Sequence, residues 1–253
     1  MRYRILGDDI QLVEILLEPG DVVQSETGSM AYMDADVHME TTTGGGLLKG
    51  LKRMLAGESF FVTHFANRTS RPLLVAFAAA YPGKIIPLDL RTVGGAFLAQ
   101  RASFLVATAD VDISIAFTRR LGAGLFGGEG FILQRFDGAG QVFFNAGGTI
   151  VEQDLAAGQE LRVDTGCIVG FAPSVTYDIQ FVKGFKNILF GGEGLFLATL
   201  RGPGKVYLQS LPLARLADRI LSAARHTGRG GGGETRGVAG LGGEIVKGII
   251  SGS

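Results

Sequence analysis

The chain has 253 residues, of which 46% are hydrophobic and 19% charged, a composition typical of a folded soluble protein with one large domain or two small ones. Its 24 basic and 24 acidic residues cancel, which argues against a protein built mainly to bind nucleic acid, because such binding depends largely on phosphate neutralisation. The single cysteine, Cys167, excludes an intramolecular disulfide, and no apolar run resembles a signal peptide or a membrane span, so we expect a cytoplasmic protein.

The first predicted element is a β unit over residues 1–88 that carries a basic, Gly- and Leu-rich insert at 41–57. The insert reads "TTTGGGLLKGLKRMLAG". As a helix it would place Leu47 and Leu51 on one side, and Lys49, Lys52 and Arg53 on another. Segment 47–55 is therefore the predicted surface for an anionic partner, either membrane headgroups or RNA. The alternative is a surface helix that only packs on the sheet.

Two further β units are predicted over residues 89–155 and 156–212. Segments 125–146 and 189–210 are identical at 10 of 22 positions, with a constant offset of 64 residues. "PGDVVQSETGSMAYMDADVHME" from Pro19 resembles "AGQELRVDTGCIVGFAPSVTYD" from Ala157, at an offset of 138, and "VGGAFLAQRASFLVATADVDIS" from Val93 is a weaker copy. Such units generally share a core or an interface, because one unit alone cannot bury its hydrophobic face.

Apolar and polar residues alternate within each unit, as in "ELRVDT" and "ADVDISIAF", which indicates half-buried antiparallel strands. The chain has 40 glycines and no tryptophan, in keeping with short strands and tight turns. "GFILQRFDGAGQVFFNAGG" predicts a hairpin that turns at Asp137–Gly138, and "GLFLATLRGPGKVYLQS" predicts a second one. The predicted fold is therefore all-β, a triplicated antiparallel β-roll or sandwich with pseudo-threefold symmetry.

The motif "LFGGEG" occurs twice, and we interpret it as a structural turn before a strand. Glycines can adopt positive φ there without a Cβ clash. "GAGLFG" at 122–127 matches a dinucleotide fingerprint, but a strand rather than a helix is predicted after it, which argues against nucleotide binding. The predicted turn residues are Gly127, Gly128, Glu129, Gly130, Gly191, Gly192, Glu193 and Gly194.

The other residues typical of catalytic or metal sites occur without the partner residues that such sites need. "DTG" at Asp164 is the tripeptide of aspartic proteases, which need two such carboxylates, but the corresponding residues are Glu26 and Gln100, so a β-turn is the simpler interpretation. Cys167 follows in an apolar context that makes a thiol inert. The three histidines lack the spacing of metal ligands. We therefore predict no catalytic, cofactor-binding or metal-binding residues; an enzyme would have to use Asp164, Glu129 or Glu193.

The sequence pattern of the C-terminal part differs from that of the β units. Apolar residues at spacings of three and four predict a short amphipathic helix over 213–226, with Pro212 suited to its first turn. Residues 227–253 are rich in glycine and are predicted to form a flexible tail.

The order of "TGSMAYM", "GGGLLKGLKRMLAGESFF", "PGKIIPLDL", "FGGEGFILQ" and "FGGEGLFLA…GPGKVYLQSL" resembles the bacterial relatives of the altered-inheritance-of-mitochondria proteins, over about residues 1–212. This resemblance implies a β-roll similar to the tryptophan RNA-binding attenuation protein, repeated within the chain and associated into a ring, with trimers as the expected oligomer. Mitochondrial relatives are tied to inner-membrane organisation and respiratory-chain integrity. The family has no established catalytic residues, so none are carried over.

Three functional hypotheses follow. The first is a non-catalytic assembly or scaffold protein, a cytoplasmic homo-oligomer in which a trimer is favoured over a dimer, with a protein or the inner-membrane surface as partner. The second is a binding module that presents segment 47–55 to an anionic partner; zero net charge argues against nucleic acid in that role. The third, an enzyme, has carboxylates but no nucleophile, partner histidine or metal set.

Overall fold

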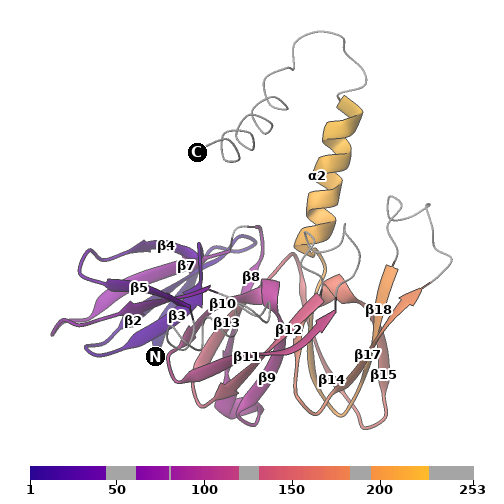
Figure 1. The fold of residues 1–253 in the computed structure, drawn as a ribbon, viewed down its shortest axis with the longest axis horizontal. Coiled ribbons are helices and arrows are strands. Elements are labelled where there is room, and N and C mark those ends of the chain that lie inside the picture. Colours follow the sequence, from indigo (N-terminus) through magenta and orange to yellow (C-terminus); the bar gives the residue numbers. More distant parts are fainter. Residues whose placement is uncertain (44–60, 80, 120–130, 183–194, 228–253) are drawn as a thin grey trace, which may run out of the picture. The chain divides into compact units, whose positions relative to one another are not determined.

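The computed structural model describes residues 1–43, 61–79, 81–119, 131–182 and 195–227, in two compact units, Met1–Ala214 and Arg215–Ser253. The described part of the first unit is built from antiparallel strands (Figure 1). Its strands are β1 (Arg2–Leu6), β2 (Leu12–Leu17), β3 (Val22–Glu26), β4 (Met30–Met33), β5 (His38–Thr43), β6 (Phe61–Ala66), β7 (Leu73–Ala78), β8 (Lys84–Asp89), β9 (Ala96–Gln100), β10 (Phe104–Thr108), β11 (Val111–Arg119), β12 (Phe131–Gly138), β13 (Gln141–Ala146), β14 (Ile150–Leu155), β15 (Glu160–Asp164), β16 (Ile168–Phe171), β17 (Thr176–Val182), β18 (Leu195–Arg201) and β19 (Gly204–Gln209).

The described residues also include 3₁₀ turns between strands: η1 (Leu90–Val93), η2 (Arg101–Ser103) and η4 (Thr165–Cys167). The one described α-helix, α2 (Leu213–Thr227), confirms the helix predicted over 213–226. The predicted tail lies outside the described residues, apart from Thr227. Among the described residues, no helix combines the length and apolar character needed to span a membrane.

The strands form four antiparallel sheets, called here A to D, which confirms the predicted all-β class. Their strand orders are β1-β2-β7-β4 in sheet A, β5-β6-β3-β10-β13-β8 in sheet B, β11-β12-β9-β16-β19-β14 in sheet C, and β15-β18-β17 in sheet D. Strands such as β3, with the sequence VVQSE, alternate between buried and partly exposed residues, as the period of two predicts.

The strand orders follow one pattern when the strands are taken in three sets of six: β2–β7, β8–β13 and β14–β19. In every set the first, sixth and third strands lie side by side, as in β2-β7-β4, and so do the fourth, fifth and second, as in β5-β6-β3. The second strand of set one pairs with the third of set two, β3 with β10, and likewise β9 pairs with β16. The triplication of the sequence, the β-roll likeness and the unit boundaries at 88 and 155 stay predictions.

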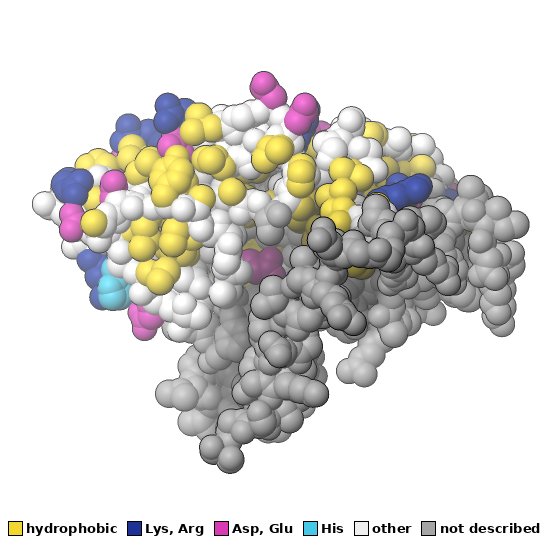
Figure 2. Space-filling model, turned by 90° about the horizontal axis from the view of Figure 1, so that it is seen from above, with side chains coloured by type: hydrophobic (Ala, Val, Ile, Leu, Met, Phe, Trp, Pro, Cys, Tyr) yellow, Lys and Arg dark blue, Asp and Glu magenta, His cyan; other side chains and the backbone are white. Residues whose placement is uncertain are grey.

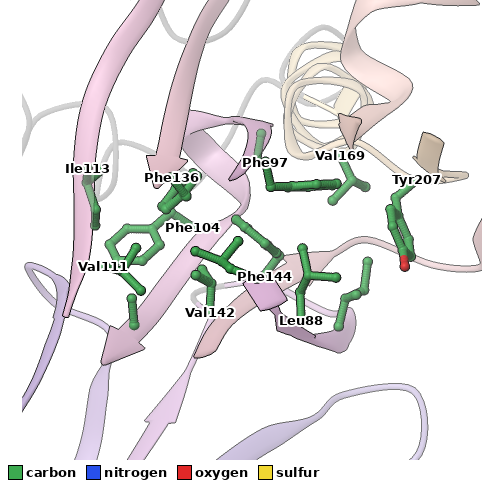
Figure 3. Packing of buried hydrophobic residues seen from close by; sticks show 14 of the residues in the cluster. Leu88, Phe97, Phe104, Val111, Ile113, Phe136, Val142, Phe144, Val169 and Tyr207 are labelled. Carbon is green, nitrogen blue, oxygen red and sulfur yellow. The ribbon is translucent and has the colours of Figure 1, made fainter. Parts of the chain in front are cut away.

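Three hydrophobic cores lie between the sheets, because each inner sheet buries both of its faces. In sheet B, Val106 and Phe143 belong to a core shared with sheet A, whereas Phe104 and Phe144 belong to a core shared with sheet C. Figure 3 shows this second core, where Phe97 contacts Phe144 and Tyr207 with ring centroids 5.4 and 5.8 Å apart. The third core lies between sheets C and D and includes Phe171 and Leu200.

The two predicted hairpins are wrong. The strands on either side of Asp137–Gly138, β12 and β13, are not paired with each other: β12 belongs to sheet C and β13 to sheet B. β18 and β19 are separated in the same way. These glycine-rich turns move the chain from one sheet to the next across a core. Gly140 packs against that crossing so tightly that a Cβ there would lie 2.0 Å from Thr108 Oγ1.

Candidate functional site

All the residues predicted to form the basic surface and the glycine turns lie outside the described residues. These are Lys49, Lys52, Arg53, Gly127, Gly128, Glu129, Gly130, Gly191, Gly192, Glu193 and Gly194. The strands that flank them are described. Residues 41–43 of the predicted insert belong to β5, and the rest of it falls between β5 and β6. The two "GGEG" motifs fall between β11 and β12 and between β17 and β18. All three segments therefore join the fourth to the fifth strand of a set, and those strands are paired in each case.

The "DTG" motif forms a turn, and its carboxylate has a structural role. Asp164 caps η4, and its Oδ1 accepts a hydrogen bond from the backbone N–H of Gly166 at 2.9 Å. Cys167 ends the same turn, half-buried beside the third core. Among the described residues, no three His, Cys, Asp or Glu side chains are grouped as metal ligands would be.

Next to this turn, the buried amide of Gln209 joins two backbone segments. Its Nε2 donates to the Gly166 carbonyl at 2.8 Å, and its Oε1 accepts from the Gly147 N–H at 2.8 Å. Asn145 precedes Gln209 by the repeat offset of 64 residues and is also buried, yet among the described residues neither of its amide atoms makes a hydrogen bond of standard geometry, and the polar group that it interacts with is the Tyr81 hydroxyl. The shorter asparagine side chain therefore does not reproduce the link that Gln209 makes.

A shallow hollow of about 460 Å³ on the outer face of β3, β5 and β6 brings two histidines together. His38 and His64 line it with Glu40 and Arg68. The Glu40 carboxylate lies 4.0 Å from His38 Nε2 and 3.9 Å from the Arg68 guanidinium, so these are loose surface ion pairs. Sequence reasoning missed this grouping because it depends on the pairing of β5 with β6, which sets Glu40 opposite His64.

The structure also reveals two sheet edges that differ from all the others. The first and fourth strands of sets two and three are sheet edges, and so is β5, the fourth strand of set one. The first strand of set one, β2, is covered by the additional strand β1, which forms the edge in its place. The second and third strands are internal in every case but two. Among the described strands, β4 in the third position ends sheet A, and β15 in the second position ends sheet D; neither has there the neighbour that the matching strands of the other sets have. In Figure 1 these strands lie at opposite ends of the first unit.

The β4 edge carries a buried carboxylate beneath an exposed tyrosine. Glu14 accepts hydrogen bonds from the Tyr32 hydroxyl at 2.5 Å and from Arg4 Nε at 2.8 Å, and its side chain is only 8% exposed. These two donors hold the pKa of the Glu14 carboxyl below its usual range, and the bond to Glu14 raises the pKa of the Tyr32 phenol. Tyr32 itself is 43% exposed.

On the face shown in Figure 2, exposed hydrophobic side chains gather in groups, and Lys, Arg, Asp and Glu lie mainly along the rim of that face. At the β15 edge, Arg162 is exposed, Leu161 is half-buried and Val163 is buried. A strand edge of this composition offers unpaired backbone groups and a partly uncovered apolar flank, the two features by which a further strand is recruited.

Comparison with known proteins gives three similarities. The model of the family described as "Mitochondrial biogenesis AIM24" matches residues 3–211. An uncharacterised protein of Streptococcus pyogenes serotype M6 is 33% identical over 222 residues, which cover 83% of this chain and 85% of that protein. A Streptococcus pyogenes protein with a crystal structure from a structural genomics consortium is 29% identical, with a TM-score of 0.70, over 88% of this chain and 99% of the other.

Proposed function

The chain belongs to the AIM24 family, described as mitochondrial biogenesis proteins, and on that basis we propose that it is a non-catalytic scaffold protein that works as a homo-oligomer. The observation that carries the proposal is the unmatched pair of edges at β4 and β15. Unpaired strands recruit further strands unless they are protected, and an edge at each end of the first unit suits repeated association of identical chains.

Closure of such an assembly into a ring leaves neither edge unpaired. We propose three chains as the number that closes it, in keeping with the family resemblance, and two as the next alternative. The assembly is proposed to act in the cytoplasm on a protein partner or at the inner-membrane surface. The basic segment 47–55 remains a predicted contact for an anionic partner, and its residues lie outside those that the structure describes.

The non-catalytic part of the proposal is supported by what the most reactive-looking carboxylate does. Asp164 caps a turn: its Oδ1 accepts a hydrogen bond from the Gly166 N–H, which is a structural role. Replacement of Asp164 by asparagine should leave stability nearly unchanged, because the asparagine Oδ1 can accept the same hydrogen bond. It should remove no hydrolytic activity, because the wild-type protein is expected to have none on generic peptide or ester substrates. Hydrolysis that is lost in Asp164→Asn would overturn this part.

The test of self-association is native mass spectrometry of the full-length protein, with light scattering across the micromolar range. We expect one oligomer, a trimer, with little monomer. A protein that stays monomeric throughout would overturn the scaffold proposal. A bound lipid or RNA fragment in the same spectrum would instead favour a binding module that uses segment 47–55.

A further inference from the structure

We infer that β4 of one protomer pairs with β15 of the next in one defined antiparallel register, with Tyr32 opposite the partner's Val163 and Met33 opposite the partner's Arg162. This inference rests on the proposed self-association, and it names the surface and the partner: a second copy of this chain, through its β15 edge. It is carried by the strand orders, by the internal pairings of the same kind, and by side-chain sizes.

The strand orders show that sheets A and D are two halves of a sheet that the molecule already builds twice. Sheet B runs β5-β6-β3-β10-β13-β8, the fourth, fifth and second strands of one set followed by the third, sixth and first of the next, and sheet C repeats this order. Sheet D ends after its first half, β17-β18-β15, and sheet A begins with the second, β4-β7-β2. Joining β15 to β4 completes a third six-strand sheet, with β1 added at its end.

The register follows from the two internal junctions. In sheet B, Val106 lies opposite Ser25, and in sheet C, Gly170 lies opposite Ala99. The offset of 64 residues between the second and third units relates Val106 on β10 to Gly170 on β16, and it likewise relates Ala99 on β9 to Val163 on β15. The offset of 138 residues between the first and third units places Tyr32 at the position of Gly170.

An irregularity in the third-position strands supports this alignment independently. β10 has a bulge between Phe104 and Val106 in its pairing with β13. β16 has one at the same offset, between Ile168 and Gly170, and β4 has one between Met30 and Tyr32. Because a bulge shifts the register by one residue, its recurrence at matching positions means that the three strands present the same residues to their second neighbour. The residue after the bulge in β4 is Tyr32.

Side-chain sizes at the junctions are complementary. In sheet C the third-position strand has Gly170, and a Cβ there would lie 2.4 Å from Cε1 of Phe97, two residues before its opposite number Ala99. In the inferred junction the sizes are exchanged: Tyr32 is large, and Leu161, two residues before Val163, is smaller than Phe97. Leu161 borders the third core and Tyr32 would lie on the same face of the joined sheet, so the Tyr32 ring would continue that core across the junction onto sheet A.

The polar end of Tyr32 is also accommodated. Its hydroxyl already bonds to Glu14, which is held by Arg4, so the ring can be buried against the partner without an unsatisfied hydroxyl. On the other face, Met33 packs on the core of its own chain, and Arg162 is exposed. The aliphatic part of Arg162 can lie along Met33 while its guanidinium stays in water.

The test is disulfide trapping in the full-length protein. Cys167 is first replaced by serine, the residue present at the corresponding positions 29 and 103. Met33→Cys and Arg162→Cys are then combined, because opposite Cα atoms in an antiparallel pair lie about 4.5–5.5 Å apart, within the range of a disulfide. Oxidation should convert most chains into covalently linked oligomers of the native size. Asp34→Cys with Leu161→Cys, the adjacent pair of the same register, is a second combination in case the first does not fold.

The matched control is Met33→Cys with Glu160→Cys, on the same face of β15 but shifted by two residues, or about 6–7 Å along the strand, beyond disulfide reach. Oligomers that cross-link through the first two pairs but not through the control support the inference. Oligomers that fail to cross-link, or that cross-link equally in the control, overturn the register and leave self-association standing. Protein that is monomeric before oxidation overturns both.

Discussion

At the scale of single residues, Gln209 and Asn145 form a natural comparison, because they occupy matching positions and only the longer side chain links two backbone segments. We expect Gln209→Leu to lower the free energy of unfolding by about 2–4 kcal/mol, since the buried Gly147 N–H and Gly166 carbonyl lose their partner. Asn145→Leu should cost much less, because among the described residues the Asn145 amide makes no hydrogen bond of standard geometry and interacts with the Tyr81 hydroxyl. Urea denaturation of both variants tests this; equal losses would contradict it.

A second residue-scale prediction concerns acid. Glu14 has a folded-state pKa below the ordinary 4.5, so its bonds to Tyr32 and Arg4 stabilise the fold above that pH. This contribution is lost as the pH falls through 4.5 towards the lowered value, because the proton then favours the unfolded chain. Glu14→Gln cannot titrate there. The melting temperature of the wild type should exceed that of the variant at pH 7, and the gap should shrink at about pH 3.

Melting curves by circular dichroism at several pH values provide the measurement, and Glu152→Gln serves as an exposed control on β14, where little change is expected. A gap between wild type and Glu14→Gln that is constant from pH 7 to about pH 3 would show that the lowered pKa of Glu14 makes no net contribution to folding.

At the scale of elements, the close approach of β16 to β9 depends on one missing side chain. Gly170→Ala would place a Cβ 2.4 Å from Phe97 Cε1 and 2.6 Å from the Leu98 carbonyl oxygen, so we expect a loss of about 1–3 kcal/mol. Gly166→Ala is the control: its nearest neighbours would be Pro212 atoms at 3.4 Å, and set two has alanine at the matching position 102. Unfolding free energies that fall equally in both variants would rule out the steric cause.

The elements also show how far the sequence could be interpreted. Alternation in "ELRVD" correctly predicted β15, and helical spacing from Leu213 correctly predicted α2. The turn at Asp137–Gly138 was misassigned to a hairpin because glycines allow tight reversals of either kind, whereas the choice between pairing and crossing is made by distant strands. The hollow with His38 and His64 was missed for the same reason: no local pattern tells which strands become neighbours.

At the scale of the whole molecule, consecutive sets of strands share cores: the core between sheets A and B contains residues of sets one and two, and the core between sheets B and C contains residues of sets two and three. Tyr207 and Val169 of set three help to fill the core between sheets B and C. A chain that ends at residue 155 loses both of them together with β16 and β19, and it should melt at a much lower temperature and less cooperatively than a chain that ends at residue 212. Thermal unfolding by circular dichroism compares the two; equal melting temperatures would mean that the sets fold independently.

In the proposed assembly, the β4 edge of one chain meets the β15 edge of the next, so every protomer would have a direction. The rotation that relates successive chains then decides the form of the assembly. If that rotation closes after a whole number of chains the result is a ring, and if it does not the result is an open filament. A fragment that keeps only one of the two ends would act as a terminator, because it can join the assembly and then offers nothing to the next chain. Substoichiometric amounts of such a fragment should therefore inhibit assembly of the full-length chain.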